Sequence, residues 1–142
     1  MTIEAYEAHQ AVYGRAQPFL ELRSVSFVLA MPPSVNEAWH HIPATGGKAL
    51  TDAHRQFRTN TISRVRAAMG RGTTLAGRIE MTARLYFNNR RRCDIDNRVK
   101  PLQDALTHAK AYHDDSQIDA LHVFRIFGAA EECEVTLKEI AA

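Results

Sequence analysis

The chain has 142 residues and 45% hydrophobic content, which suffices for one domain with a substantial core and is too little for two ordinary domains. Its formal net charge of +2 is nearly balanced, so only the placement of charges, and not their sum, can indicate a nucleic-acid partner. Cys93 and Cys133 stand far apart and give little support to a zinc finger or a redox dithiol. No membrane-spanning run or signal peptide is visible, so the cytoplasm is the expected location.

The N-terminal part of the sequence contains one clear strand and one long loop. Residues 1–21 are expected to form a peripheral extension, followed by a single domain over residues 22–142. Alternating apolar side chains predict a strand at residues 24–29. The turn-rich stretch 31–48 predicts one long loop, a feature typical of functional or disordered segments. Its Trp39 argues against pure disorder, and we expect that side chain in the core rather than stacked on a base.

The middle of the chain predicts a helix and then a strand. Apolar residues recur every three or four positions over residues 49–69, the pattern of an amphipathic helix, and Gly70 provides a left-handed stop. The other face of this helix carries four arginines: Arg55, Arg58, Arg64 and Arg66. A strict two-residue alternation over residues 78–87 then predicts a strand.

The last third of the sequence predicts a second helix and two strands. The helix covers about residues 96–109, with Pro101 near its first turn because proline lacks a backbone N–H. Residues 118–127 and 133–137 read as strands, and the short connection between them predicts an antiparallel hairpin. The order of elements indicates an α+β fold, a small mixed β-sheet with two main helices packed on one face.

Acidic residues gather around the start of the second helix. Asp94 and Asp96 alternate along an extended segment, so their carboxylates project to one side and could share a cation. Carboxylate oxygens are the ligands that Mg2+ prefers. Lys100 follows Asp96 by about one helical turn and would contact a phosphate or neutralise charge in a transition state.

Asp114 and Asp115 follow the second helix and reach its start only if the next strand runs alongside strand 78–87. An alternative remains for both acidic motifs, since Asp-x-Asp-Asn is also typical of a helix N-cap and Asp-Asp-Ser of a turn. The run of basic residues before Asp94 is likewise typical of a solvated loop, although beside a catalytic acid cluster it would hold phosphates. It consists of Arg90, Arg91 and Arg92.

The segment from Asp94 to Leu106, followed by Asp114-Asp115-Ser116-Gln117-Ile118, closely resembles the signature of RusA-type Holliday-junction resolvases. The loop Pro32–Asn36 resembles an early motif of the same family. The similarity spans about residues 24–138. It implies a Mg2+-dependent homodimer, with Mn2+ as a substitute for Mg2+, that cuts four-way DNA junctions by paired symmetric nicks.

The resemblance also implies residue roles. Catalysis would fall on Asp94, Asp96, Lys100 and Asp115, and metal binding on Asp94, Asp96 and Asp115. Asp114, Asp104 and Asn97 are secondary candidates, with Asp104 suited either to orienting Lys100 or to metal contact. Phosphate contacts are expected from Arg90, Arg91, Arg92, Lys48, Arg55 and Arg58, although Lys48 and Arg55 are equally typical of a solvated surface.

Two other function classes remain open at this stage. A junction-binding protein without nuclease activity would need the same basic surface, and a small-molecule phosphohydrolase would need the same acids. The histidines lack the paired spacing of a zinc site. The four considered for such a site are His40, His41, His54 and His113.

Overall fold

The computed structural model of the chain describes residues 2, 22–37, 39–42, 44 and 46–141. The predicted N-terminal extension therefore lies outside the described residues, apart from Thr2. Within the described part of the chain, no helix is long and apolar enough to cross a membrane.

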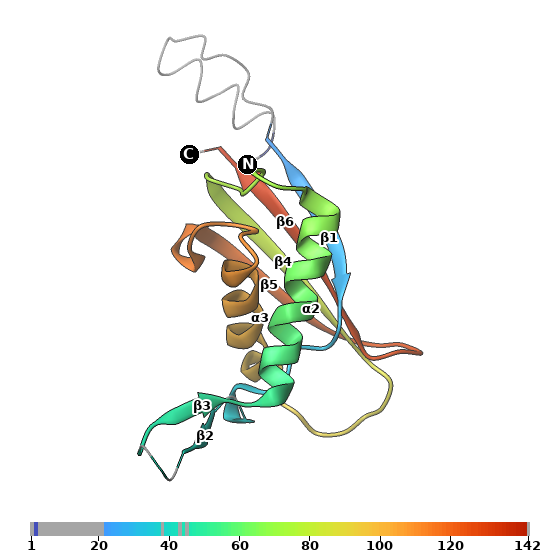
Figure 1. Cartoon of the computed structure of the whole chain (residues 1–142). Helices are drawn as coiled ribbons and strands as arrows, with labels where there is room; N and C mark the ends of the chain where they lie inside the picture. Colours follow the sequence, from blue (N-terminus) through green and yellow to red (C-terminus); the bar gives the residue numbers. More distant parts are fainter. Residues whose placement is uncertain (1, 3–21, 38, 43, 45, 142) are drawn as a thin grey trace, which may run out of the picture.

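A four-stranded mixed sheet carries two helices on one face, as Figure 1 shows. Its strands, in spatial order, are β1 (Ser24–Leu29), β6 (Glu132–Ile140), β4 (Arg78–Phe87) and β5 (Ile118–Phe127). The helices are α2 (Asp52–Met69) and α3 (Asp96–His108). Strand β4 runs parallel to β5 and antiparallel to β6, and β6 is antiparallel to β1. The predicted α+β class and mixed sheet are confirmed.

Strand β4 is the central scaffold of the domain. Every second side chain, from Ile79 to Phe87, is buried, as the alternation predicted. Leu102 and Leu106 of α3 are buried with this row in one core. Because each fully buried side chain of this size contributes about 1.5–3 kcal/mol, the row fixes which face of β4 meets the helices.

The predicted hairpin of the last two strands is wrong. Strands β5 and β6 do not pair with each other, because both pair with β4, on its opposite edges. Helix α3 forms the crossover from β4 to the parallel β5, and the connection 128–131 then passes the end of β4, where Gly128 N–H donates to the Phe87 carbonyl at 2.9 Å. Four residues easily span two strand spacings, about 10 Å, so loop length could not distinguish a hairpin from this crossing.

Helix α2 begins at Asp52, three residues later than predicted, and buries an unexpected set of side chains. His54, Phe57, Thr61 and Val65 face the core, whereas the sequence pattern had skipped the two polar members. Both find hydrogen-bond partners, since His54 Nε2 lies 2.9 Å from the Ser34 carbonyl oxygen and the Thr61 hydroxyl donates to the Phe57 carbonyl. Buried polar groups are tolerated when they are paired in this way.

The predicted long loop contains regular structure. A short 3-10 helix, η1 (Val35–Glu37), is followed by the two-stranded hairpin of β2 (Trp39–His41) and β3 (Lys48–Leu50). In Figure 1 this hairpin projects beyond the end of the domain at which both helices begin. The Trp39 side chain is outside the described part of the structure, so its predicted core position stays a prediction.

Candidate active site

The connection from β4 to α3 presents two unpaired carboxylates. Asp94 lies in this connection and Asp96 is the first residue of α3, and both are exposed. The N-cap position belongs to Ile95 and no side chain caps the helix, so the capping alternative for these aspartates is not supported. No hydrogen bond or ion pair with any described residue engages either carboxylate. Their charges are therefore not neutralised by the described part of the chain.

Two arginines that the sequence analysis did not single out hold this segment from both sides. Arg98, in the first turn of α3, donates through Nη1 to the Pro32 carbonyl at 2.8 Å. Arg125 of β5 donates to the Cys93 carbonyl and lies over the Phe87 ring, 5.4 Å from its centroid. Of the two, only Arg98 could have been noticed in the sequence. A cation near a helix N-terminus is unfavourable to the helix dipole, so its presence there suggests a specific partner.

On the other side of α3, Asp114 and Gln117 shape the turn that presents Asp115. Asp114 caps η2 (Asp115–Gln117), and its Oδ2 accepts from Ser116 N–H at 3.3 Å. Hydrogen bonds from Ser116 hold the pKa of Asp114 below its usual range. Asp114 is thus a capping residue, which leaves Asp115 as the acid available for other contacts.

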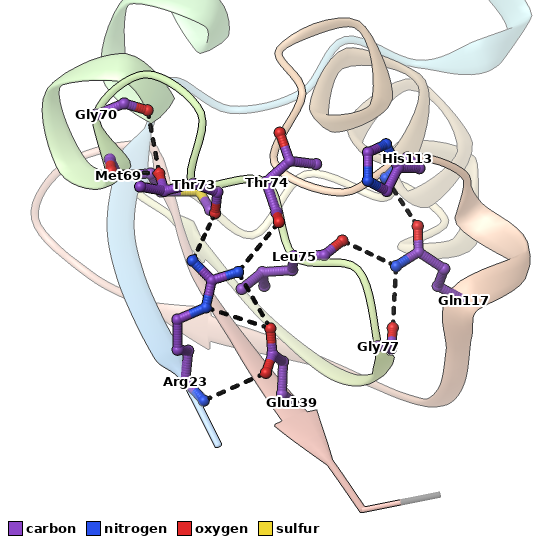
Figure 2. A network of polar contacts seen from close by, with 10 residues as sticks. All are labelled: Arg23, Met69, Gly70, Thr73, Thr74, Leu75, Gly77, His113, Gln117 and Glu139. Atoms are coloured by element: carbon purple, nitrogen blue, oxygen red, sulfur yellow. Dashed lines mark hydrogen bonds and ion pairs between the residues drawn. The ribbon is translucent and has the colours of Figure 1, made fainter. Parts of the chain in front are cut away.

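Gln117 anchors this turn to the body of the domain, as Figure 2 shows. Its Oε1 accepts from the backbone N–H groups of His113 and Asp114, at 2.7 and 2.9 Å. Its Nε2 donates to the carbonyls of Leu75 and Gly77, both at 2.9 Å. One buried side chain therefore fixes the position of η2 relative to the start of β4.

Lys100 contacts two acids, one on its own helix and one in the turn before β5. Its Nζ lies 3.0 Å from Asp104 Oδ1, one turn further along α3, and 3.2 Å from Asp115 Oδ2. Hydrogen bonds to Asp104 and then to Asp115 raise the pKa of Lys100, so the amine stays protonated at neutral pH. For Asp115 to reach α3, the strand after it had to run alongside strand 78–87. This requirement is met, because β5 pairs in parallel with β4.

The acids nevertheless fall into two groups. Within the described residues, no group of three or more histidine, cysteine, aspartate or glutamate side chains is placed to hold a metal ion. Asp115 pairs with Lys100 instead, while Asp94 and Asp96 face solvent at the start of α3. Asp104 contacts Lys100, as expected of a residue that orients the lysine. Asn97, next to Asp96 in the chain, is half-buried.

The predicted phosphate-binding residues differ in their availability. Arg90, Arg91 and Arg92 are all exposed, and Arg90 lies over the Phe127 ring, 4.7 Å from its centroid. Lys48 is exposed on the β2–β3 hairpin. Arg55 forms an ion pair with Asp52, and Arg58 is half-buried. Figure 1 places both the connection 88–95 and the hairpin at the end of the domain where α2 and α3 begin.

In a comparison with known protein families, residues 30–138, which include the acids and Lys100, match the family model of endodeoxyribonuclease RusA. The chain belongs to the RusA family. A RusA crossover junction endodeoxyribonuclease from Enterobacteria phage HK97 is 31% identical over 113 residues, covering 73% of this chain and 84% of that relative. Those of Escherichia coli strains O1:K1 / APEC and K12 are 29% identical over 97 residues, covering 68% of this chain and 78% of each relative.

The RusA match confirms the resemblance drawn from the sequence and, with it, the assignment to a family of nucleases. The matched region contains both acidic segments, Lys100 and the Pro32–Asn36 loop. It begins inside the described domain and leaves the predicted extension outside.

Proposed function

We propose that this RusA-family chain cuts four-way DNA junctions by metal-dependent hydrolysis of one phosphodiester bond on each of two strands. The observation that carries the proposal is the Lys100 ammonium held between Asp104 and Asp115, one helical turn from the unpaired acids at the start of α3. The names of the phage and bacterial relatives, crossover junction endodeoxyribonucleases, support the same substrate.

The acidic side chains suit a hard divalent cation in their chemistry. Carboxylate oxygens are the preferred protein ligands of Mg2+ and of Mn2+ in its place, and Asp94, Asp96 and Asp115 would hold the ion once it draws the two groups of acids together. Asp94 and Asp96 bring negative charge that no described side chain compensates. When bound, such an ion polarises a phosphate oxygen and lowers the pKa of a water molecule toward neutrality.

Lys100 would stabilise negative charge on the phosphate during hydrolysis. Its side chain is 58% exposed, so a substrate oxygen can approach it without disrupting the core. Asp104 lies four residues further along the same helix and positions the ammonium, while Asp115 links it to the turn before β5. Charge-assisted hydrogen bonds of this kind are worth most where charge develops in the transition state.

DNA would be held at the end of the domain where the helices begin. The three arginines 90–92 are exposed and only Cys93 separates them from Asp94, so they can neutralise flanking phosphates. Lys48 on the projecting hairpin extends the basic surface, whereas Arg55 is partly neutralised by Asp52. These contacts would position the backbone without reading its sequence.

A four-way junction has near two-fold symmetry and needs two cuts, so we propose that the active species is a homodimer. Strand β5 is the candidate interface, because it is a terminal strand of the sheet and carries exposed apolar side chains. Leu121, Phe124 and Phe127 are 42%, 49% and 51% exposed. The double variant Leu121→Glu/Phe124→Glu should shift the molar mass measured by light scattering from two chains to one.

The deciding experiment incubates the purified chain with a synthetic four-way junction and a matched linear duplex, with and without Mg2+. Paired symmetric nicks confined to the junction, and lost on removal of Mg2+, are expected. Lys100→Ala should abolish them, while Lys138→Ala, which removes an exposed lysine from β6, should not. Equal cutting of both DNAs would contradict the junction proposal.

The same experiment separates the two alternatives. Junction binding without cleavage in either Mg2+ or Mn2+ would show a binding protein. Turnover of phosphate esters without preference for branched DNA would show a small-molecule phosphohydrolase.

A further inference from the structure

A cavity of about 260 Å³ lies away from the acids, between the C-terminal ends of α2 and α3. Its lining includes four basic side chains, Arg66, Arg71, His108 and Lys110, and, among the described residues, no acid. All four residues are exposed to solvent. A hollow whose lining residues include four basic ones and, among the described residues, no acid is suited to an anion.

The basic groups are not needed to cap the two helices. At the end of α2, the Arg66 carbonyl accepts from Gly70 N–H at 2.9 Å, and the Thr73 hydroxyl donates to the carbonyls of Met69 and Gly70. The last carbonyls of α3 likewise accept backbone N–H groups from the turn that follows. Cations often occupy such helix ends as partners for free carbonyls, but here backbone and threonine donors already fill that role.

The backbone around the cavity is also unusual. Lys110 has φ 63° and occupies the position after the α3 C-cap, where glycine is normally preferred. It is the one non-glycine residue with positive φ in the described chain. On the opposite wall, Gly70 and Gly72 have φ 76° and 73°. A Cβ at either position would meet nothing within 4 Å, so the backbone conformation, and not lack of space, favours glycine there. Lys110 thus brings a basic residue to a position of the cavity wall that usually carries glycine.

A separate network of hydrogen bonds holds the wall formed by residues 70–74, as Figure 2 shows. Arg23 donates to the carbonyls of Thr73 and Thr74 at 2.8 and 3.0 Å. The same guanidinium contacts Glu139 of β6 at 3.3 Å. The Arg23 side chain, itself paired with the Glu139 carboxylate, therefore anchors this wall, and the cavity is preformed rather than the product of a loose loop.

We propose that this cavity binds a phosphate group of the DNA backbone outside the point of cleavage, an inference that rests on the proposed junction nuclease function. His108 lies eight residues beyond Lys100 on α3, which is about 12 Å along the helix axis. A phosphate three to four base pairs from the cut lies at about that distance along a duplex. The cavity would thus hold the same DNA arm at a second point and fix its angle to the active site.

The test compares two charge-matched double variants in junction binding without divalent metal. Arg66→Gln/Arg71→Gln removes two cavity charges, and Arg64→Gln/Lys138→Gln removes two exposed charges outside the cavity lining. We expect the cavity variant to bind the junction roughly tenfold more weakly, with a salt-dependence slope lower by about 1. The Arg64→Gln/Lys138→Gln control should resemble wild type in affinity, salt-dependence slope and cleavage rate, and Arg66→Lys/Arg71→Lys should resemble wild type in affinity and slope because it keeps both charges.

Several outcomes would overturn the inference. If wild type binds and cuts the junction but the cavity variant matches the control in affinity and slope, the cavity takes no DNA phosphate. If inorganic phosphate at constant ionic strength shifts the amide resonances of Gly70 and Gly72 while the cavity variant binds the junction normally, the ligand is a free phosphate instead. If wild type does not bind the junction, the proposed function fails and the inference fails with it. Thermal melts of each variant confirm that it is folded.

Discussion

Replacing Lys100 by methionine tests whether the Lys100–Asp104–Asp115 contacts serve catalysis or stability. Methionine keeps an unbranched side chain of similar length and removes the ammonium, with a sulfur in place of one methylene. The lysine is 58% exposed and its two partners are 38% and 34% exposed, so solvent screens both ion pairs. Their combined contribution to the free energy of unfolding should be about 1 kcal/mol or less, a fall in Tm of roughly 3 °C. Loss of a transition-state donor should instead lower the cleavage rate about 100- to 1,000-fold.

The assay is single-turnover cleavage of a four-way junction in Mg2+, with Lys138→Met as the charge-matched control. Asp104 and then Asp115 raise the pKa of Lys100 above its ordinary value of 10.5. The stabilising contribution of the ammonium is therefore fully present below pH 10.5 and is lost only as pH rises through the raised value. The difference in Tm between wild type and Lys100→Met should then be constant from about pH 6 to 9. A wild-type cleavage rate in Lys100→Met, or a Tm lower by ten degrees or more, would refute the reasoning.

Four other substitutions give contrasting expectations. Asp115→Asn should lower the rate of junction cleavage at least about 100-fold. Asp114→Asn should keep the wild-type rate, because asparagine can also cap η2. Cleavage rates measured on gels would show the opposite order if the two residues had exchanged roles. Gln117→Leu should lower the free energy of unfolding by about 3 kcal/mol and Tm by roughly 10 °C in calorimetry, since four backbone groups lose their partner; an unchanged Tm would contradict this. Asp119→Asn should leave cleavage unchanged. Because Arg78 lowers the pKa of Asp119, the wild-type advantage in Tm should be present above pH 3.8 and disappear as pH falls below it, and melts across that range check the sign.

Local patterns were sufficient for the strands and helices that face the core with apolar side chains. The β4 alternation predicted its buried face correctly from Ile79 to Phe87. The same reasoning missed His54 and Thr61, because their burial depends on a carbonyl in the Pro32–Asn36 loop and on one in α2. The hairpin error has a similar origin: the order of β5, β4 and β6 is set by the α3 crossover, a tertiary feature that periodicity does not contain.

For the candidate site, the sequence motif indicated the acids and the lysine but not their grouping. Asp104 contacts Lys100 because the two stand four residues apart on a helix, which spacing alone can predict. Asp115 contacts the same ammonium only because Gln117 fixes its turn beneath β4, and Arg125 reaches Cys93 from a strand 32 residues away. Such contacts depend on packing between distant segments and could not be read from local spacing.

The hydrogen bonds of Gln117 have a consequence for when the chain becomes able to cut. Leu75 and Gly77 precede the central strand, while the turn that carries Asp115 follows the second helix, so Lys100 meets its second acid only after these distant stretches have docked. Contacts between segments far apart in sequence form late, because chain entropy opposes closing the intervening loop. If Lys100 and Asp115 act as proposed, a half-synthesised or partly unfolded copy would leave DNA intact, and the ability to nick it would emerge only on completion of folding.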